Sequence, residues 1–427
     1  MELKPLRQGS VPAGYKHTEV GVIPENWEVV ATADLVEPTA PICYGVVQVG
    51  QDTNGGVPIV AIKYVKEIAS SPLHRTSATL EEPYARSRVK GGDVLISIKG
   101  TIGRVGIVPE GFEGNISREL ARLRLKPNYS AEYVAQQLDA DSTQSRISRS
   151  VVGTTRLEFS IATLRKFELA VPKNRDEQRA IATALSDVDG LLGGLDRLIA
   201  KKRDLKQAAM QQLLTGQTRL PGFHGEWKPW TILQIAPNII DYRGRTPLKL
   251  GMEWGGGDIP ALSARNVKMG YIDCQEETYF GSDALYTRWM TNGHARKGDL
   301  VITTEAPLGN VALISDDRKY ILSQRTVLLQ VDPSIASSRF LHQLMMGGRF
   351  QQVLAENSSG STATGIQRKR FEKLELTLPE VSEQTAIAEV LADIDAELAA
   401  LEQRREKTRA LKQAMMQQFL TGRIRLV

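Results

Sequence analysis

Residues 176–220 read DEQRAIATALSDVDGLLGGLDRLIAKKRDLKQAAMQQLLTGQTRL, and residues 382–426 read SEQTAIAEVLADIDAELAALEQRREKTRALKQAMMQQFLTGRIRL. The two segments align without a gap at an offset of 206 residues, and 24 of their 45 positions are identical. Internal repeats on this scale decide the organisation of a chain before any local structure is assigned. A period this long indicates two domain-sized copies and not an array of short repeats.

The same offset continues upstream at lower identity. GGDVLISIKGTIGRVGIV (91–108) matches KGDLVITTEAPLGNVALI (297–314), and Ser117 recurs as Ser323. After a gain of one residue, GTTRLEFSIATLRKFELAVP (153–172) matches GSTATGIQRKRFEKLELTLP (360–379). Each copy therefore consists of a divergent first part and a well-preserved last part. The pattern indicates a common frame that carries two different surfaces.

The preserved segments have the periodicity of helices. Apolar residues recur at alternating spacings of three and four, which is typical of a heptad seam. Such a seam can bury itself against its own domain, or the two helices can pack on each other as an antiparallel pair, and two seams of equal length favour the second arrangement. A 39-residue helix would be about 58 Å long, which exceeds one turn of DNA, about 34–36 Å. The residues of the predicted helix and partner interface are Ile181, Leu185, Val188, Leu192 and Leu195, and Ile387, Leu391, Ile394, Leu398 and Leu401.

The divergent parts have a mixed α/β pattern. Short β-branched runs bounded by Gly or Pro predict strands, and residues 131–140 and 336–346 are expected to be helical. The predicted fold class is α+β: a tandem duplication of a mixed α/β domain followed by a long helix, with the two helices pairing as an antiparallel coiled coil. The predicted parts are an N-terminal arm and first variable domain (1–172), a helical spacer (173–214), a linker (215–226), a second variable domain (227–379) and a second helical spacer (380–427).

Composition limits the possible classes of protein. The chain is 41% hydrophobic and 24% charged, with a net charge of +5, which permits a polyanionic partner without requiring one. No apolar run is long enough to span a bilayer, and the N-terminus does not resemble a signal peptide, so we expect a cytoplasmic protein. The two cysteines, Cys43 and Cys274, are too few for a disulfide framework.

The sequence contains no motif that predicts catalysis. It lacks a P-loop, a nucleophile elbow, metal-ligand spacing among its five histidines, and the Asn-Pro-Pro-aromatic motif of amino-methyltransferases. Asp187 and Asp189 recur as Asp393 and Asp395, but residues two apart on a helix point to different faces. We therefore expect a binding protein that is not an enzyme and that holds no cofactor or metal.

Three polar loops in each copy have the residue types that contact DNA. Recognition of base edges requires Arg, Lys, Asn, Gln, Ser or Thr on loops, with further basic groups on phosphates. The alternative is that these are ordinary polar loops. The candidates are Lys99, Thr101 and Arg104, with Asn310 in the second copy; Asn115, Ser117 and Arg118, with Ser323, Gln324 and Arg325; and Thr154 and Arg156, with Thr362, Gln367, Arg368 and Lys369. Weaker candidates are Lys63, Arg245 and Arg265.

The order of variable domain, helix, variable domain and similar helix resembles the specificity (S) subunit of type I restriction–modification enzymes. Each helix opens with E-Q-x-A-I-A and ends with K-Q-A-x-M-Q-Q-x-L-T-G-x-x-R-L, and the opening Tyr15-Lys16-x-Thr18-Glu19-x-Gly21-x-Ile23-Pro24-Glu25-x-Trp27 is also similar to that family. Arg404-Arg405 stands where the first helix has Leu198-Ile199, which departs from an even seam.

The resemblance implies a division of labour. Each variable domain would be a target recognition domain for one half of a bipartite, asymmetric site in double-stranded DNA. The helices would set the spacing and dock two methyltransferase (M) subunits, and restriction (R) subunits would attach through the M subunits. S-adenosylmethionine, ATP and Mg would be bound by those partners. We expect Asp at Leu185 and Leu391 to abolish assembly.

Two other functions remain compatible with the sequence. A specificity subunit of a type IIB-like system would serve one partner that both cuts and methylates. A coiled-coil scaffold that binds no DNA would show no loss of DNA affinity with rising salt. A stand-alone methyltransferase is disfavoured by the missing motifs.

Overall fold

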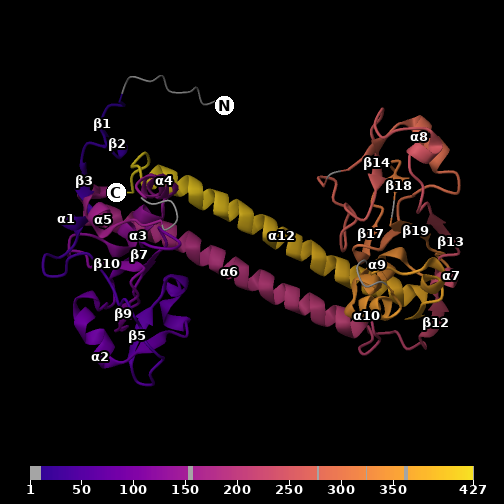
Figure 1. The fold of residues 1–427 in the computed structure, drawn as a ribbon, viewed down its shortest axis with the longest axis horizontal. Coiled ribbons are helices and arrows are strands. Elements are labelled where there is room, and N and C mark those ends of the chain that lie inside the picture. Colours follow the sequence, from indigo (N-terminus) through magenta and orange to yellow (C-terminus); the bar gives the residue numbers. More distant parts are fainter. Residues whose placement is uncertain (1–10, 152–156, 277, 324, 360–363, 427) are drawn as a thin grey trace. The chain divides into compact units, whose positions relative to one another are not determined.

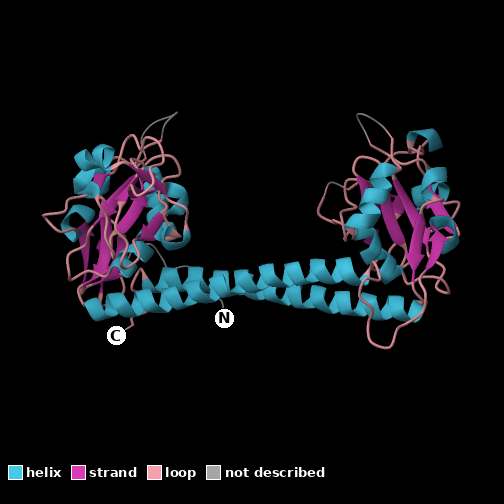
Figure 2. Cartoon of the chain, turned by 90° about the horizontal axis from the view of Figure 1, so that it is seen from below, coloured by secondary structure: helices cyan, strands magenta, loops and turns pink. Residues whose placement is uncertain are grey.

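The computed structural model of the chain describes residues 11–151, 157–276, 278–323, 325–359 and 364–426 (Figure 1). It divides into two units, one formed by Met1–Asp196 with Gln403–Val427 and the other by Arg197–Glu402. Both boundaries fall inside the two long helices, so each unit holds part of each helix. Within each unit the strands gather at the centre and helices flank them (Figure 2).

A four-stranded antiparallel sheet, in the order β4-β10-β7-β8, forms the centre of the first unit. All four residues of β7 are buried, as expected for a continuous apolar run covered on both faces. A three-stranded sheet has the order β6-β5-β9, and two further antiparallel pairs are β1-β2, which is a hairpin, and β3-β11, which joins distant parts of the chain. The strands are β1 (Tyr15–Thr18), β2 (Gly21–Pro24), β3 (Trp27–Ala31), β4 (Cys43–Tyr44), β5 (Val57–Val60), β6 (His74–Thr76), β7 (Val94–Ser97), β8 (Val105–Ile107), β9 (Asn115–Ile116), β10 (Leu120–Leu123) and β11 (Glu168–Pro172).

Short helices complete the first unit. Helix α3 begins where the Ser130 hydroxyl accepts a hydrogen bond from the amide of Tyr133, and it buries Tyr133, Val134 and Leu138 in the core. The helices are α1 (Thr32–Leu35), α2 (Ala78–Glu81), α3 (Ala131–Asp139), α4 (Asp141–Arg149) and α5 (Ile161–Lys166), with the 3-10 turns η1 (Ile62–Tyr64), η2 (Ile68–Ser70) and η3 (Glu82–Ser87).

The second unit repeats this topology. Its sheets have the orders β13-β19-β16-β17, β15-β14-β18 and β12-β20. The register is repeated as well, since Leu120 lies opposite Ser97 and Thr326 lies opposite Thr303. The elements are β12 (Lys228–Thr231), α7 (Ile232–Ile235), β13 (Asn238–Asp241), η4 (Leu248–Leu250), β14 (Ile259–Leu262), β15 (Phe280–Gly281), α8 (Asp283–Trp289), β16 (Leu300–Thr304), β17 (Leu308–Leu313), β18 (Ile321–Leu322), β19 (Thr326–Gln330), α9 (Ser338–Met346), α10 (Gly348–Glu356), α11 (Arg368–Phe371) and β20 (Glu375–Leu378).

The long helices α6 (Arg175–Leu213) and α12 (Val381–Phe419) have 39 residues each, the predicted length. They pair antiparallel within each unit, as the ion pairs between them show. In the first unit Asp189 bonds to Lys412 and Asp196 to Arg405, at 2.7 and 3.4 Å. In the second, Asp395 bonds to Lys206 at 2.6 Å. The predicted fold class is therefore confirmed.

The start of each predicted seam is shared between the helix pair and the domain core. Ile181 and Leu185 are fully buried in the core of the first unit, against which Phe419 of α12 also packs. Ile387 and Leu391 are fully buried in the core of the second unit together with Leu213 of α6. Asp at Leu185 or Leu391 would disrupt a domain core and would not report on a partner surface.

Candidate nucleic-acid interface

Two predicted loops of the first unit, 99–104 and 115–119, meet the segment that follows the third predicted loop at one end of the central sheet. The amide of Ile98, which follows β7, donates to the carbonyl of Glu119 at 2.7 Å. The amide of Phe159 donates to the carbonyl of Ile98 at 2.9 Å, and Lys99 forms an ion pair with Glu158 at 3.3 Å. The backbone after β7 therefore lies between Glu119 and the segment that contains Phe159.

The second unit brings its loops together through equivalent bonds. The amide of Thr304 donates to the carbonyl of Arg325 at 2.8 Å, and that of Ile366 donates to the carbonyl of Thr304 at 3.0 Å. Loops that are up to about 60 residues apart in each copy thus form one surface. The structure supplies the hydrogen bonds that join these segments.

Most of the predicted loop residues in the described part of the chain are accessible. Thr154, Arg156, Gln324 and Thr362 lie outside the described residues. Lys63 and Arg265 are exposed and lie on segments beside the first loop of their units, since Gly100 approaches Ile62 and Asn310 bonds to the carbonyl of Val267. The exposed candidates are Lys63, Thr101, Arg118, Arg265, Arg325, Gln367, Arg368 and Lys369; the half-buried ones are Lys99, Arg104, Arg245 and Asn310.

The prediction that Asn115 contacts DNA is wrong, because its side chain belongs to the core and not to a binding surface. It is fully buried, and its Nδ2 donates to Glu81 at 2.7 Å and to the carbonyl of Tyr84 at 3.0 Å. Its Oδ1 accepts from Ser87 at 2.8 Å. Glu81 is itself buried, and hydrogen bonds from Arg88 hold the pKa of its carboxyl below the ordinary value. With no donor left over, Asn115 connects β9 to α2 and η3.

Three further candidates are poorly placed to contact a base edge. Ser117 and Ser323 are buried, at 6% and 8% exposure, which leaves little of either hydroxyl accessible. The guanidinium of Arg245 bonds to the carbonyl of Trp289 and to Thr291.

The glycines of the first loop also have an internal role. Gly103 and Gly309 both have a positive φ, +87° and +88°. Each carbonyl accepts a hydrogen bond at 2.9 Å from a glutamine, Gln144 on α4 or Gln351 on α10. A Cβ at either glycine would collide with that glutamine side chain. The close neighbour of these glycines is therefore the domain itself.

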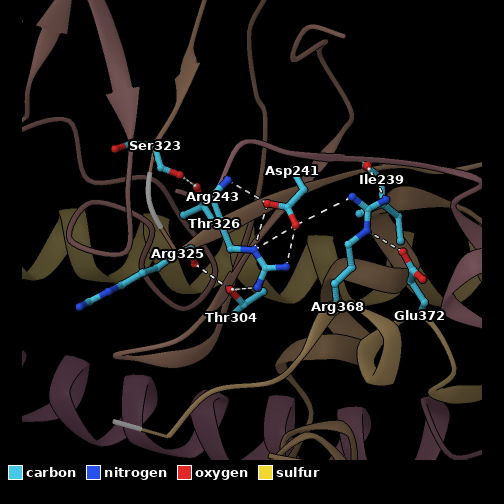
Figure 3. Close-up of polar contacts among 9 residues, drawn as sticks. All are labelled: Ile239, Asp241, Arg243, Thr304, Ser323, Arg325, Thr326, Arg368 and Glu372. Carbon is cyan, nitrogen blue, oxygen red and sulfur yellow. Dashed lines mark hydrogen bonds and ion pairs between the residues drawn. The ribbon is translucent and has the colours of Figure 1, made fainter. Parts of the chain in front are cut away.

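Sequence reasoning missed a cluster at the convergence in the second unit, centred on Asp241 (Figure 3). The carboxylate of Asp241 forms an ion pair with Arg243 at 2.6 Å and with Arg368 at 3.9 Å. Arg243 also donates to the Thr304 hydroxyl at 3.3 Å, and Thr304 donates to the carbonyl of Arg325 at 3.3 Å. Asp241 thus lies between two guanidinium groups and fixes both beside the loops.

The electrostatics of this cluster favour charged side chains. Burial alone would raise the pKa of Asp241, but hydrogen bonds from Arg243 and the charge of Arg368 outweigh it and lower the pKa. Arg325 is half exposed, extends away from the cluster in Figure 3, and faces Glu305 at 3.6 Å. A loose ion pair between exposed groups contributes little stability, so Arg325 can exchange Glu305 for a phosphate at little cost.

Asp241 and Arg243 were missed because they lie at the end of β13 and just after it, far in sequence from the loops that they support. The only sign of this ion pair in the sequence is the Asp241-Tyr242-Arg243 spacing. An Asp and an Arg two positions apart are too common to identify a binding site by themselves. Within the described residues, no cluster of His, Cys, Asp and Glu is placed to hold a metal ion. Nor does any helix in that part of the chain have the length and apolar character needed to cross a membrane.

A duplicated α/β unit with polar loops gathered at one end of each sheet defines a class of two-domain recognition proteins. The family model for the type I restriction modification DNA specificity domain matches residues 24–199 and again 225–410. The chain belongs to this family, with one specificity domain in each copy.

Relatives of known name agree with this assignment. The chain is 25% identical over 204 residues to the EcoBI specificity subunit of Escherichia coli, which covers 46% of this chain and 43% of that protein. It is 24% identical to the putative MjaX specificity subunit of Methanocaldococcus jannaschii, covering 96% of this chain and 97% of that one.

Solved structures share the fold. The S subunit of a type I system from M. genitalium matches with a TM-score of 0.55 at 15% identity, covering 92% of this chain and 96% of that one. A chain from a study of type I assembly and conformational transition matches with a TM-score of 0.57 at 16% identity, covering 94% and 99%. The protein is a type I specificity subunit with two recognition domains.

Proposed function

We propose that each unit recognises one half of a bipartite, asymmetric DNA site through its three convergent loops. The observation that carries the proposal is that one frame, repeated with the same register and the same loop-joining bonds, presents different side chains. Lys99 and Arg104 of the first copy are replaced by Glu305 and Asn310, and Glu119 is replaced by Arg325. Different side chains on equal frames recognise different base pairs.

The charge of the loops suits a duplex. Arg118 in the first unit and Arg325, Arg368 and Lys369 in the second are exposed beside the convergent backbone. Such cations contact phosphates and fix the position of the domain, while neighbouring Thr, Asn and Gln side chains contact base edges. Asp241 acts as a positioning residue that holds Arg368.

The remaining functions fall to partner subunits. In this proposal the paired helices set the spacing between half-sites and dock two methyltransferase subunits, to which restriction subunits attach. The chain itself is not an enzyme and binds no cofactor; S-adenosylmethionine, ATP and Mg belong to its partners. The repeated helix surface supports two equivalent docking sites, because a pseudo-twofold chain can present the same patch twice.

The test is enrichment from randomised duplex DNA by the chain assembled with its methyltransferase partners. We expect two different short motifs separated by an unspecified spacer of fixed length, with affinity that falls steeply as salt rises. Methylation mapping in cells with and without the gene should report the same two motifs. A single contiguous motif, a palindrome, or binding without sequence preference would contradict the proposal.

A further inference from the structure

A strongly basic cavity lies in the first unit, away from the convergent loops. It has a volume of about 760 Å³ and is bounded by β4, β5, η3 and β10. Strand β10 has Leu120 opposite Ser97, at the loop end, and Leu123 opposite Val94, at the other end. The cavity is at this other end, and no predicted DNA-contacting residue lines it. Its basic lining residues are Arg86, Arg88, Lys90, Arg122, Arg124 and Arg165.

The charge of this cavity is not balanced within the described part of the chain. Arg88 is paired with Glu81 at 2.6 Å and Arg124 with Asp93 at 2.8 Å. Glu113 is the acidic residue among those that line the cavity. The other four cations have no carboxylate within ion-pair distance among the described residues, which leaves a clear excess of positive charge.

Arg122 is the most informative of these residues. Its side chain is 3% exposed, and its guanidinium donates to the carbonyls of Arg88 and Pro41 at 3.1 and 3.3 Å. Its Nε is buried and has no acceptor. Burying a charge without a counter-charge is costly, and burial lowers the pKa of this group from its ordinary value. An anion in the cavity would supply the missing counter-charge.

The shared frame does not require an arginine here. Arg122 lies opposite Leu95, and the equivalent residue of the second unit, Leu328, lies opposite Val301 in the same register. Leu328 is fully buried in an apolar cluster with Val301 and Ile240. The neighbouring Arg124 is likewise replaced by Gln330, which bonds to Asp299 at 2.9 Å. A leucine therefore satisfies the fold at this position, and the arginine calls for another explanation.

We propose that this cavity of the first unit is a binding site for a phosphoryl group. Guanidinium groups match the oxygens of a phosphate in geometry as well as charge, and Arg86, Lys90 and Arg165 line the same cavity as Arg122. The phosphoryl group can come from the DNA backbone or from a free phosphorylated molecule. The site is separate from the proposed base-recognition surface, because none of the described loop residues lines it.

The experiment is calorimetric titration of inorganic phosphate into the full chain assembled with its partners, at constant ionic strength. Arg122→Leu copies the second unit, and Arg86→Gln removes an exposed cation. We expect saturable binding by the unmodified chain and about 10- to 100-fold weaker binding by both variants, as for loss of a hydrogen bond to a charged group. Lys173→Gln, which removes an exposed cation outside the cavity, should bind as the unmodified chain does.

A folding measurement separates binding from damage. Without phosphate, Arg122→Leu should unfold at the same temperature as the unmodified chain or higher, because leucine relieves a buried charge. Phosphate should raise the melting temperature of the unmodified chain and not that of the variant.

Adding duplex DNA with the cognate site identifies the source of the phosphoryl group. Weaker phosphate binding in its presence indicates the DNA backbone, and unchanged binding indicates a free ligand; either result supports the site. The proposal is overturned if millimolar phosphate shows no saturable binding, or if Arg122→Leu binds as tightly as the unmodified chain.

Discussion

At the scale of single residues, burial decides which polar side chains can contact DNA. Asn115 and Arg118 are three positions apart in one loop, yet Asn115 is fully buried while Arg118 is exposed. The difference arises from α2 and η3, which precede the loop by about 30 residues and cover Asn115 with Glu81 and Tyr84. No property of the loop sequence itself reports this cover, so individual contact residues could not be predicted from the sequence.

This contrast gives a paired prediction. Asn115→Ala should lower the free energy of unfolding by about 1–3 kcal/mol, because buried Glu81 and Ser87 lose hydrogen-bond partners. Arg118→Ala should leave the unfolding free energy within about 0.5 kcal/mol and weaken DNA binding instead. Urea unfolding and DNA titration of both variants would check this. Equal stability of the two variants would show that Asn115 is not a core residue.

At the scale of elements, the sequence predicted two long helices within the spacers 173–214 and 380–427, and α6 and α12 have the predicted length of 39 residues. The helices α3 and α9 were also predicted close to their observed bounds. Their periodicity is local, and local patterns suffice to define an element. The sequence did not show that the seam of α6 has two neighbours: Ile181 and Leu185 are buried in a cluster that joins the domain core to Phe419 of α12, and Asp189 and Asp196 form ion pairs with α12. Periodicity shows that a stripe is buried and does not identify what covers it.

The loop after β7 gives the second prediction. Gly103→Ala should cost about 1–3 kcal/mol, because alanine is strained at a positive φ and would displace Gln144. If the loop contacts DNA, the first half-site should lose specificity while the second is retained. Gly309→Ala should produce the reverse pattern. Enrichment from randomised DNA would measure both effects.

A glycine elsewhere in the same unit supplies the control. Gly190 lies in α6 with no atom close to the position of an added Cβ. Gly190→Ala should therefore stabilise the chain by about 1 kcal/mol, the difference in helix propensity. If Gly103→Ala lowered the free energy of unfolding no more than Gly190→Ala does, the proposed support of the loop by the hydrogen bond from Gln144 would be wrong.

At the scale of the whole molecule, the duplication is preserved in the bonds that hold each unit together. Glu177 bonds to Arg425 in the first unit, and Glu383 bonds to Arg219 in the second, with one member of each pair buried. Asp189 with Lys412 and Asp395 with Lys206 repeat the same relation. These pairs give an internal role to four of the 24 identical positions, Glu177, Asp189, Lys206 and Arg219 with their equivalents, because each residue forms the same bond in its own unit.

Some repeated residues have no such internal role, and they indicate where two identical partners would dock. Leu205 and Leu411 are equivalent, and both are about half exposed, at 50% and 55%. An exposed leucine retained in both copies does not serve the fold. Leu198 is also exposed, at 43%, but its equivalent in the second helix is Arg404. It is therefore a control for the loss of an exposed leucine that is not repeated.

We therefore predict that Leu205→Asp and Leu411→Asp each remove one methyltransferase subunit from the complex, and that the double variant removes both. Truncating a central apolar contact should weaken each association by about tenfold or more, while exposure at both positions leaves folding unchanged. Leu198→Asp should retain two partners, because only a repeated patch can bind two copies of one protein alike. Mass measurement of the purified complexes distinguishes these outcomes, and a double variant that still binds two subunits would place the docking surface elsewhere on the chain.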